Sequence, residues 1–217
     1  QSGLDSISFL TTNTQISVIH AADFNADGEA DLVIGNAGTQ TVTVLMNGSA
    51  GATLIQRVLS TGSEPTSIAT ADLDGDGDLD LAIGHRTQQT VAVLFNDGTG
   101  VFSAPTELFV GGAVTHLALG DFDTDGDVDL AATDDGSTVF IYKNDGVGSF
   151  GAPQTASGLT SPTGLRIGDF TGDGIDDLLL SGTGNRVRLL RNQGNATFTS
   201  LTDVDFSSTP QALTTGD

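Results

Sequence analysis

Residues 72–80 read DLDGDGDLD, which places five aspartates within nine residues and separates them only with leucine and glycine. Carboxylates this close repel one another, and two that share a site push one pKa upward. The stretch therefore indicates a solvated acidic run, a catalytic cluster or a loop that binds a cation. It recurs three times in the same register, as DFNADGEAD at 23–31, DFDTDGDVD at 121–129 and DFTGDGIDD at 169–177.

These copies belong to a longer repeat, because they begin 49, 49 and 48 residues apart. Each acidic stretch follows a short apolar segment and runs into another, as in DLAIG at 80–84. A third segment ends in Asn before a Gly-containing turn, of the kind that closes tight hairpins. A fourth extended segment follows, as at 101–110, 149–156 and 197–206. The unit is thus four short strands, repeated at about 17–65, 66–113, 114–162 and 163–210.

The repeat predicts an all-β fold. The third segment is apolar on both alternating sets, as Val42, Val44 and Leu45 show, so its strand is expected to be covered on both faces. No stretch keeps a 3.6-residue period. Four-stranded antiparallel sheets that are covered on both sides and recur every 40 to 50 residues describe the blades of a β-propeller.

The acidic loop has the pattern of a metal-binding loop. Counted from its first Asp, positions 1, 3 and 5 carry oxygen side chains, position 6 is Gly and position 9 is Asp in all four copies. Alternating oxygen ligands around a turn that needs Gly suit Ca²⁺ better than octahedral Mg²⁺, and the lack of His and Cys within these loops excludes a zinc-type site. Position 7 varies, as expected if it offers its backbone carbonyl. The candidate ligands are Asp23, Asn25, Asp27, Glu29, Asp31; Asp72, Asp74, Asp76, Asp78, Asp80; Asp121, Asp123, Asp125, Asp127, Asp129; and Asp169, Thr171, Asp173, Ile175, Asp177.

An EF-hand is excluded by the twelfth position, where that loop needs a bidentate Glu. Here the chain has already entered an apolar strand, so the Asp at position 9 is expected to close the metal site. Asp-Gly clusters are also common turn formers, and a solvated acidic turn is the alternative. The residues at position 12 are Ile34, Ile83, Ala132 and Leu180.

The D-x-[DN]-x-D-G-x-x-D loop between two strands resembles the FG-GAP or VCBS repeat, over residues 17–206. That repeat occurs in the propeller of integrin α subunits, in a fungal lectin family and in many secreted bacterial proteins. The resemblance implies that side chains at positions 1, 3, 5 and 9 and the backbone at position 7 bind up to four Ca²⁺ ions. Asn25 and Thr171 depart from Asp at position 3, and Asp176 at position 8 offers a compensating carboxylate in the fourth loop.

The ends of the chain predict partial blades. Residues 4–10 align with the fourth strand of a preceding blade, and residues 210–217 align with the first strand of a following one. We therefore expect residues 1–217 to form a single, partial β-propeller domain with four full blades, which the resemblance makes part of a seven-bladed propeller. A closed four-bladed ring is the alternative.

Charge and composition narrow the function. A net charge of −21 argues against nucleic acid as a partner, and no apolar run approaches the ~20 residues that span a bilayer. Few acids remain outside the loops for catalysis, so we expect no enzyme activity. The expected function is an extracellular, secreted or cell-surface module for adhesion or for protein or glycan binding, assembled with further blades or subunits. A structural spacer of a surface fibre, or a propeller attached to a secreted enzyme, is the alternative.

Some residues outside the loops also need an interpretation. Arg186, Arg188 and Arg191 indicate either an anionic ligand site on the fourth blade or a local contact within it. His20 and the other two histidines fall at unrelated places in the repeat and are expected to be structural or exposed. The absence of Trp weakens a lectin interpretation, because glycan sites on propellers usually expose aromatic rings.

Overall fold

The computed structural model describes residues 15–48 and 52–207, and every regular element within these ranges is a β-strand. The strands form four antiparallel sheets, each with its strands in sequence order. The first sheet holds Ile16–Ala22 (β1), Asp31–Asn36 (β2), Thr41–Gly48 (β3) and Ala52–Ser60 (β4); the second Pro65–Ala71 (β5), Asp80–His85 (β6), Thr90–Leu94 (β7) and Thr106–Phe109 (β8); the third Val114–Gly120 (β9), Asp129–Asp134 (β10), Thr138–Tyr142 (β11) and Gln154–Ser157 (β12); the fourth Pro162–Gly168 (β13), Asp177–Gly182 (β14), Arg186–Asn192 (β15) and Phe198–Ser200 (β16), with Val204–Asp205 (β17) also paired to β15.

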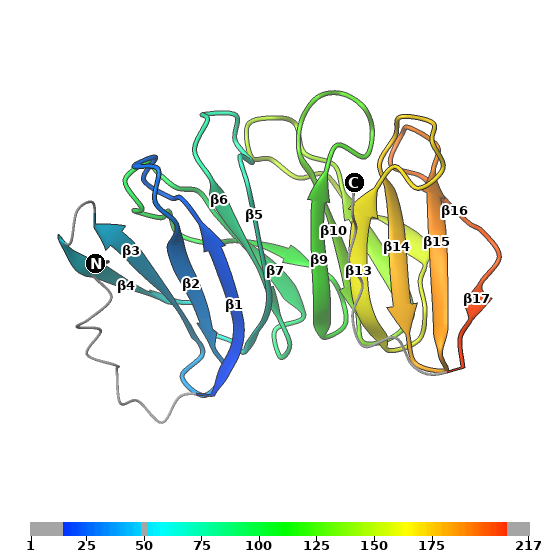
Figure 1. Cartoon of the computed structure of the whole chain (residues 1–217), viewed down its shortest axis with the longest axis horizontal. Helices are drawn as coiled ribbons and strands as arrows, with labels where there is room; N and C mark the ends of the chain where they lie inside the picture. The colour runs from blue at the N-terminus through cyan, green and yellow to red at the C-terminus, as the bar shows by residue number, and fades with distance from the viewer. Residues whose placement is uncertain (1–14, 49–51, 208–217) are drawn as a thin grey trace.

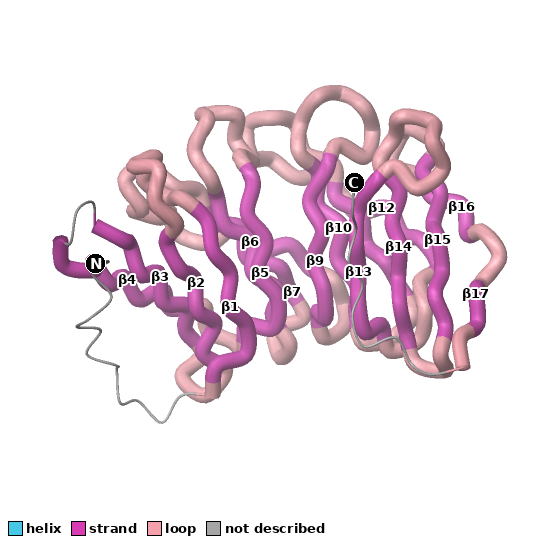
Figure 2. Tube along the Cα trace, in the orientation of Figure 1, coloured by secondary structure: helices cyan, strands magenta, loops and turns pink. Residues whose placement is uncertain are grey.

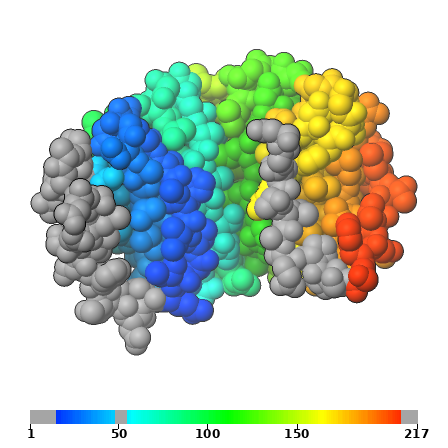
Figure 3. Space-filling view, in the orientation of Figure 1, coloured from blue at the N-terminus to red at the C-terminus, as the bar shows by residue number. Residues whose placement is uncertain are grey.

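The four sheets stand side by side as an open fan (Figure 1). Their first strands, β1, β5, β9 and β13, contact one another in that order along the inner side. In the space-filling view the repeats appear as successive bands, and the first and fourth sheets lie at opposite ends (Figure 3). This arrangement confirms the expected all-β blades, and it does not have the shape of a closed four-bladed ring.

The core lies between the sheets, with one apolar cluster at each of the three interfaces. Strand β6 contributes side chains to two of these clusters, because Leu81 and Ile83 face the first sheet whereas Ala82 faces the third. Leu178 and Leu180 of β14 pack on the third sheet in the same way. Burying such a side chain stabilises the fold by ~1.5–3 kcal/mol. A sheet that packs against a neighbouring sheet on each side therefore explains why its middle strands are apolar on both faces.

The fourth strands of the second and third sheets are shorter than the sequence predicted. Over 101–110 and 149–156 we expected continuous strands, but each begins with an isolated bridge at Phe102 or Phe150, and regular pairing starts only later. Pairing resumes at Thr106 and Gln154, each directly after a proline. Proline has no N–H to donate to a ladder, which explains the interruption.

The expected partial blades at residues 4–10 and 210–217 lie outside the described residues. Within the described part of the chain, there is no helix long and apolar enough to cross a membrane.

Candidate metal sites in the acidic loops

All four acidic stretches lie in the loop between the first and second strands of a sheet. These loops are gathered along one edge of the molecule, at the top of Figure 2. The position is set by the register of each first hairpin, because the pairs Ala22 with Asp31 and Ala71 with Asp80 close the ladder at both ends of the acidic stretch. The same functional groups are therefore presented four times on one side of the fold.

Backbone N–H groups hold each loop in shape. In the second loop, Asp72 accepts hydrogen bonds from the N–H groups of Gly75 and Gly77, at 2.8 and 3.0 Å, and Asp76 accepts one from Asp78 at 2.9 Å. Gly77 has φ +95°, in the left-handed region that favours glycine. The first, third and fourth loops repeat the bonds from positions 6 and 7, and their glycines at position 6 have φ between 82° and 97°.

The Asp at position 9 is fully buried in every loop and accepts hydrogen bonds from at least two backbone N–H groups. Asp80 accepts from Leu73 N–H at 2.8 Å and from Asn96 N–H at 2.8 Å. Burial raises the pKa of Asp80 and of Asp129 to about 6, and the hydrogen bonds from the backbone offset only part of this rise. The equivalents Asp31 and Asp177 make the same two contacts. Position 9 thus ties the loop to the end of the third strand.

Carboxylates converge in the second and third loops. Positions 1, 3 and 9 each offer an oxygen, and the three oxygens lie within 4.8 Å of one another. At position 3, one oxygen is buried without a hydrogen-bond partner: Oδ1 of Asp74 in the second loop and Oδ1 of Asp123 in the third. A buried, unpaired carboxylate oxygen is costly unless a cation meets it. The donor sets of these two loops therefore fit a hard cation.

Position 7 faces away from this cluster. A Cβ added to Gly98 would lie 2.4 Å from Oδ2 of Asp78, and the third loop repeats this with Gly146 and Asp127. Ile175 is directed at the same turn of its own sheet, because a Cβ added to Gly194 would lie 3.2 Å from its Cδ1 atom. The side chain is thus directed at the turn between the third and fourth strands, which leaves the backbone carbonyl as the group that position 7 offers.

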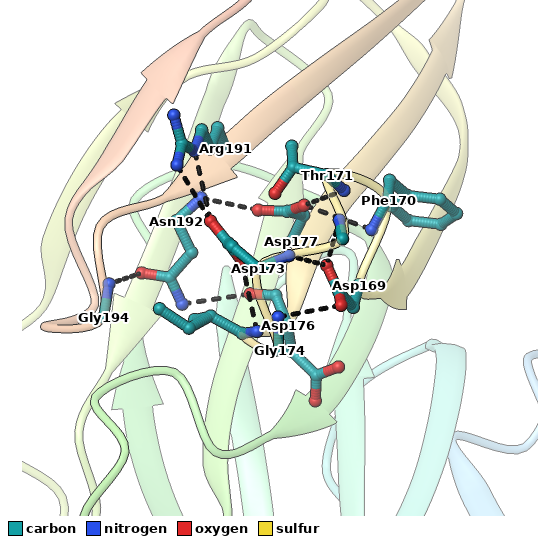
Figure 4. A network of polar contacts seen from close by, with 12 residues as sticks. Asp169, Phe170, Thr171, Asp173, Gly174, Asp176, Asp177, Arg191, Asn192 and Gly194 are labelled. Carbon is teal, nitrogen blue, oxygen red and sulfur yellow. Dashed lines mark hydrogen bonds and ion pairs between the residues drawn. The ribbon is translucent and has the colours of Figure 1, made fainter.

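The first and fourth loops lack the carboxylate triad. In the first, Asn25 donates its side-chain N–H to Asp27 at 3.2 Å and accepts from the N–H of Asp27. In the fourth, Thr171 Oγ1 is buried without a hydrogen-bond partner, while Asp173 is engaged by Arg191 at 3.0 Å (Figure 4). Hydrogen bonds from Arg191 lower the pKa of the Asp173 carboxyl. Glu29 at position 7 of the first loop is exposed.

The Asn that ends the third strand is a residue whose role sequence reasoning missed. It was interpreted as a turn residue, but Asn96, Asn144 and Asn192 are buried. Asn144 Nδ2 donates to the carbonyl of Val128 in its own loop, at 3.0 Å, and to Leu73 in the loop of the preceding sheet, at 2.8 Å. Its occurrence at one register in all four repeats was the available signal.

The side chain at position 2 makes a second connection between sheets. Phe24 packs edge-to-face on Phe102 of the second sheet, with centroids 5.6 Å apart, and Phe122 packs likewise on Phe198. The first three loops therefore contact the next sheet through both the backbone and the apolar side chain at position 2, whereas Phe170 of the fourth loop is 37% exposed.

The arginines of the fourth sheet form local contacts. Arg188 makes a two-pronged pair with Asp203, at 2.6 and 2.8 Å, and donates to two carbonyls of the third sheet. Arg186 pairs with Asp205 at 3.0 Å. Each arginine of this group already has a carboxylate partner, which favours the local-contact interpretation over an anionic ligand site.

The three histidines and the single tyrosine are all at least half-buried, and Nε2 of His85 and Nδ1 of His116 are buried without a hydrogen-bond partner. Burial lowers the pKa of His20, His85 and His116, so they are neutral at pH 7. Tyr142 donates its hydroxyl to the carbonyl of Phe109 in the neighbouring sheet, and burial raises its pKa to about 12.

Comparison with solved structures supports the propeller fold. Two structures of BBS1N in complex with ARL6DN, one soaked with mercury and one with lead, are 12% and 16% identical to this chain with TM-scores of 0.61 and 0.65; they cover 89% and 96% of it, and 55% and 60% of the BBS1N chain. A lectin from Agrocybe aegerita, which recognises non-reducing terminal N-acetylglucosamine, is 20% identical with a TM-score of 0.57, covering 85% of this chain and 51% of the lectin. At these identities the likeness shows the fold alone, and the chain spans about half to three fifths of each.

No curated protein is similar enough to this chain to count as a match. The sequence model of the FG-GAP-like repeat matches residues 23–83, 121–180 and 169–217, which include the acidic loops 23–31, 72–80, 121–129 and 169–177. These segments cover more than half of the sequence, and the chain therefore belongs to the FG-GAP-like repeat family.

Proposed function

We propose that this chain is a non-catalytic Ca²⁺-binding module of an extracellular β-propeller, and that the propeller surface binds a protein or a glycan. Ca²⁺ would be held in the loops between the first and second strands of the sheets. Its role there is to fix the loops and, through them, the contacts between neighbouring sheets.

The observation that carries the metal proposal is the convergence of three carboxylates, one of which has a buried oxygen without a hydrogen-bond partner. Asp72, Asp74 and Asp80 form one such group, and the third loop repeats it. Turn chemistry alone leaves this oxygen unpaired, whereas a cation would pair it and reduce the repulsion among the three charges. Oxygen-only ligands in an irregular loop suit Ca²⁺, and we expect a Kd on the order of 10⁻⁴ to 10⁻³ M, typical of extracellular modules.

The loops are placed so that a bound cation would stabilise more than the loop itself. The carbonyl at position 2 accepts a hydrogen bond from the Asn of the next sheet, as Leu73 does from Asn144. The residue at position 2 also enters the apolar cluster of the same interface. A cation that orders the loop therefore orders one wall of the neighbouring interface.

The binding role is supported by what propellers of this shape do elsewhere. BBS1N forms a complex with ARL6DN, and the Agrocybe aegerita lectin recognises a terminal sugar. The non-catalytic assignment is supported by the burial of His85 and Tyr142, since neither side chain is open to a ligand at the surface.

Calorimetric titration with CaCl₂ after chelator treatment tests the metal proposal, together with thermal unfolding at matched ionic strength. We expect saturable binding and a melting temperature that rises with Ca²⁺ concentration, because a ligand bound only to the folded state stabilises it. NaCl at equal ionic strength is the control. A glycan array and a protein pull-down with the Ca²⁺-loaded module then separate the two ligand classes. No binding heat and an unchanged melting temperature would refute the metal proposal.

A further inference from the structure

One position near the acidic loops differs in chemistry between the two halves of the fan. The residue directly before the Asn near the end of each third strand is Met46, Phe95, Lys143 or Arg191. In the first two sheets this side chain reaches forward: a Cβ added to Gly100 would lie 2.5 Å from Met46, and a Cβ added to Gly148 would lie 2.4 Å from Phe95. In the last two sheets the side chain is a cation, and each cation contacts an acidic loop of its own sheet.

The two cations contact their loops differently. Lys143 Nζ lies 2.9 Å from Oδ2 of Asp123, and the other oxygen of that carboxylate remains unpaired. Asp123 still belongs to the convergent triad of the third loop. The ammonium group is therefore an additional contact at the rim of a loop whose metal donors remain in place.

In the fourth loop, the guanidinium of Arg191 pairs with the carboxylate at position 5, one of the candidate metal ligands. Nε and Nη2 of Arg191 lie 3.3 and 3.0 Å from Oδ2 of Asp173, and Oδ1 of the same carboxylate accepts the N–H of Ile175 at 3.2 Å. Figure 4 shows Arg191 extending from β15 toward the loop. Both oxygens of the position-5 carboxylate are thus engaged within the protein, and guanidinium is always charged at neutral pH.

Two features weaken metal binding in the same loop. Position 3 is Thr171, a neutral donor, where the second loop has Asp74. The fourth loop also has four carboxylates against five in the second loop, and Arg191 cancels one of those charges. Affinity of such loops follows the number of charged ligands. Thr171 Oγ1 nevertheless remains buried and unpaired, so an oxygen is still presented at position 3.

We propose that Arg191 is a built-in counter-cation of the fourth loop, which keeps this loop folded without metal and closes it to Ca²⁺ until the guanidinium is removed. This inference rests on the proposed Ca²⁺ binding by the second and third loops. It divides the four loops of one repeat family into metal-binding loops and one loop neutralised by the chain itself.

The test counts Ca²⁺ ions by equilibrium dialysis and calorimetry on the full chain and on Arg191→Met, which copies the residue of the first sheet. We expect Arg191→Met to bind one more Ca²⁺ ion than the unaltered chain. The matched control is Arg186→Met: this guanidinium has the same side-chain exposure, 47%, and is also paired with a carboxylate, but it lies away from the loop. The control should leave the stoichiometry unchanged.

A second variant, Asp173→Asn, distinguishes the possible failures. The inference expects the unaltered chain and Asp173→Asn to bind the same number of Ca²⁺ ions, whereas Asp76→Asn in the second loop weakens binding. A loss of one ion in Asp173→Asn, or an unchanged count in a folded Arg191→Met, overturns the role of Arg191 while the proposed function stands. Absence of Ca²⁺ binding by the unaltered chain and by Arg191→Met overturns both.

Discussion

Asn96 of the second sheet donates a hydrogen bond of 2.8 Å from its side-chain amide to the carbonyl oxygen of Phe24, in the acidic loop of the first sheet. The same amide nitrogen lies 3.2 Å from the carbonyl of Leu79 in its own loop. One buried side chain thus connects two successive acidic loops, and its counterparts do so at the next two interfaces.

Asn144→Ala should destabilise the fold strongly. The change leaves the buried carbonyls of Leu73 and Val128 without this donor, which costs about 1–3 kcal/mol. Urea unfolding measured by circular dichroism gives the free energy of unfolding. The exposed Gln193, which uses only its backbone at the equivalent turn, is the control, and Gln193→Ala should change it by less than about 0.5 kcal/mol. Equal effects of the two substitutions would contradict the connecting role.

Asp74→Asn should weaken Ca²⁺ binding and leave the apo-protein folded. The Asp74 oxygen is unpaired, so the substitution breaks no hydrogen bond at Oδ1, but it removes one of three converging charges. We expect at least about a tenfold rise in the Kd of that loop, because ligand charge sets affinity. Calorimetry measures the Kd, and the exposed Glu64, changed to Gln, controls for net charge. A Kd equal to that of the unaltered chain would show that Asp74 is no ligand.

Stability without Ca²⁺ should rise as the pH falls from 7 toward 5. The folded-state pKa of Asp80 and of Asp129 is about 6, above the usual value of 3.8, because burial disfavours their charge. A raised pKa means that the folded state binds these protons first, so the stabilisation is present at low pH and is lost as the pH rises through about 6. Melting temperatures in chelator at pH 5, 6 and 7 measure this trend.

Calcium should reverse that trend, since the ion binds the ionised carboxylates and competes with protons. The gain in melting temperature at a fixed Ca²⁺ concentration is therefore expected to shrink between pH 7 and pH 5. Parallel curves with and without Ca²⁺ across this range would be inconsistent with Asp80 and Asp129 as ligands.

Gly148→Ala should destabilise the second interface. The added Cβ would lie 2.4 Å from the ring of Phe95, and the residue has φ +74°. Overpacking costs about 1–3 kcal/mol, and a left-handed residue with a Cβ adds about 1–2 kcal/mol. Denaturant unfolding measures the loss. In the double variant Phe95→Ala with Gly148→Ala, the part of the destabilisation that comes from overpacking should disappear. If it does not, the whole loss of stability comes from the left-handed backbone conformation at residue 148.

Much of the fold followed from the repeat. The alternation and the recurring acidic loops gave the four-stranded sheets, because each repeat shows where its strands begin and end. Breaks such as the one before Thr106 were missed, since an extended segment with one proline has the same apolar pattern as a continuous strand.

The sequence predicted where the candidate site lies, but it did not predict which side chains from other strands contact it. Sequence spacing placed Asp74 and Asp80 in one loop, whereas the contact of Arg191 with Asp173 depends on where a side chain of β15 points. The buried Asn was missed for a similar reason: an Asn that opens a Gly-containing turn has a common local explanation, and its long-range bonds exist only after two sheets have packed.

The contact between Gly148 and Phe95 has a consequence for how such arrays grow. At the next interface the glycine is replaced by Ala196 and the aromatic by Lys143, so both partners change together. If the fourth repeat directly followed the second, Phe95 would meet Ala196 in place of Gly148, where a Cβ would lie 2.4 Å from its ring. The pair therefore restricts the order of the repeats, because the second repeat needs a glycine at this position in whichever repeat follows it.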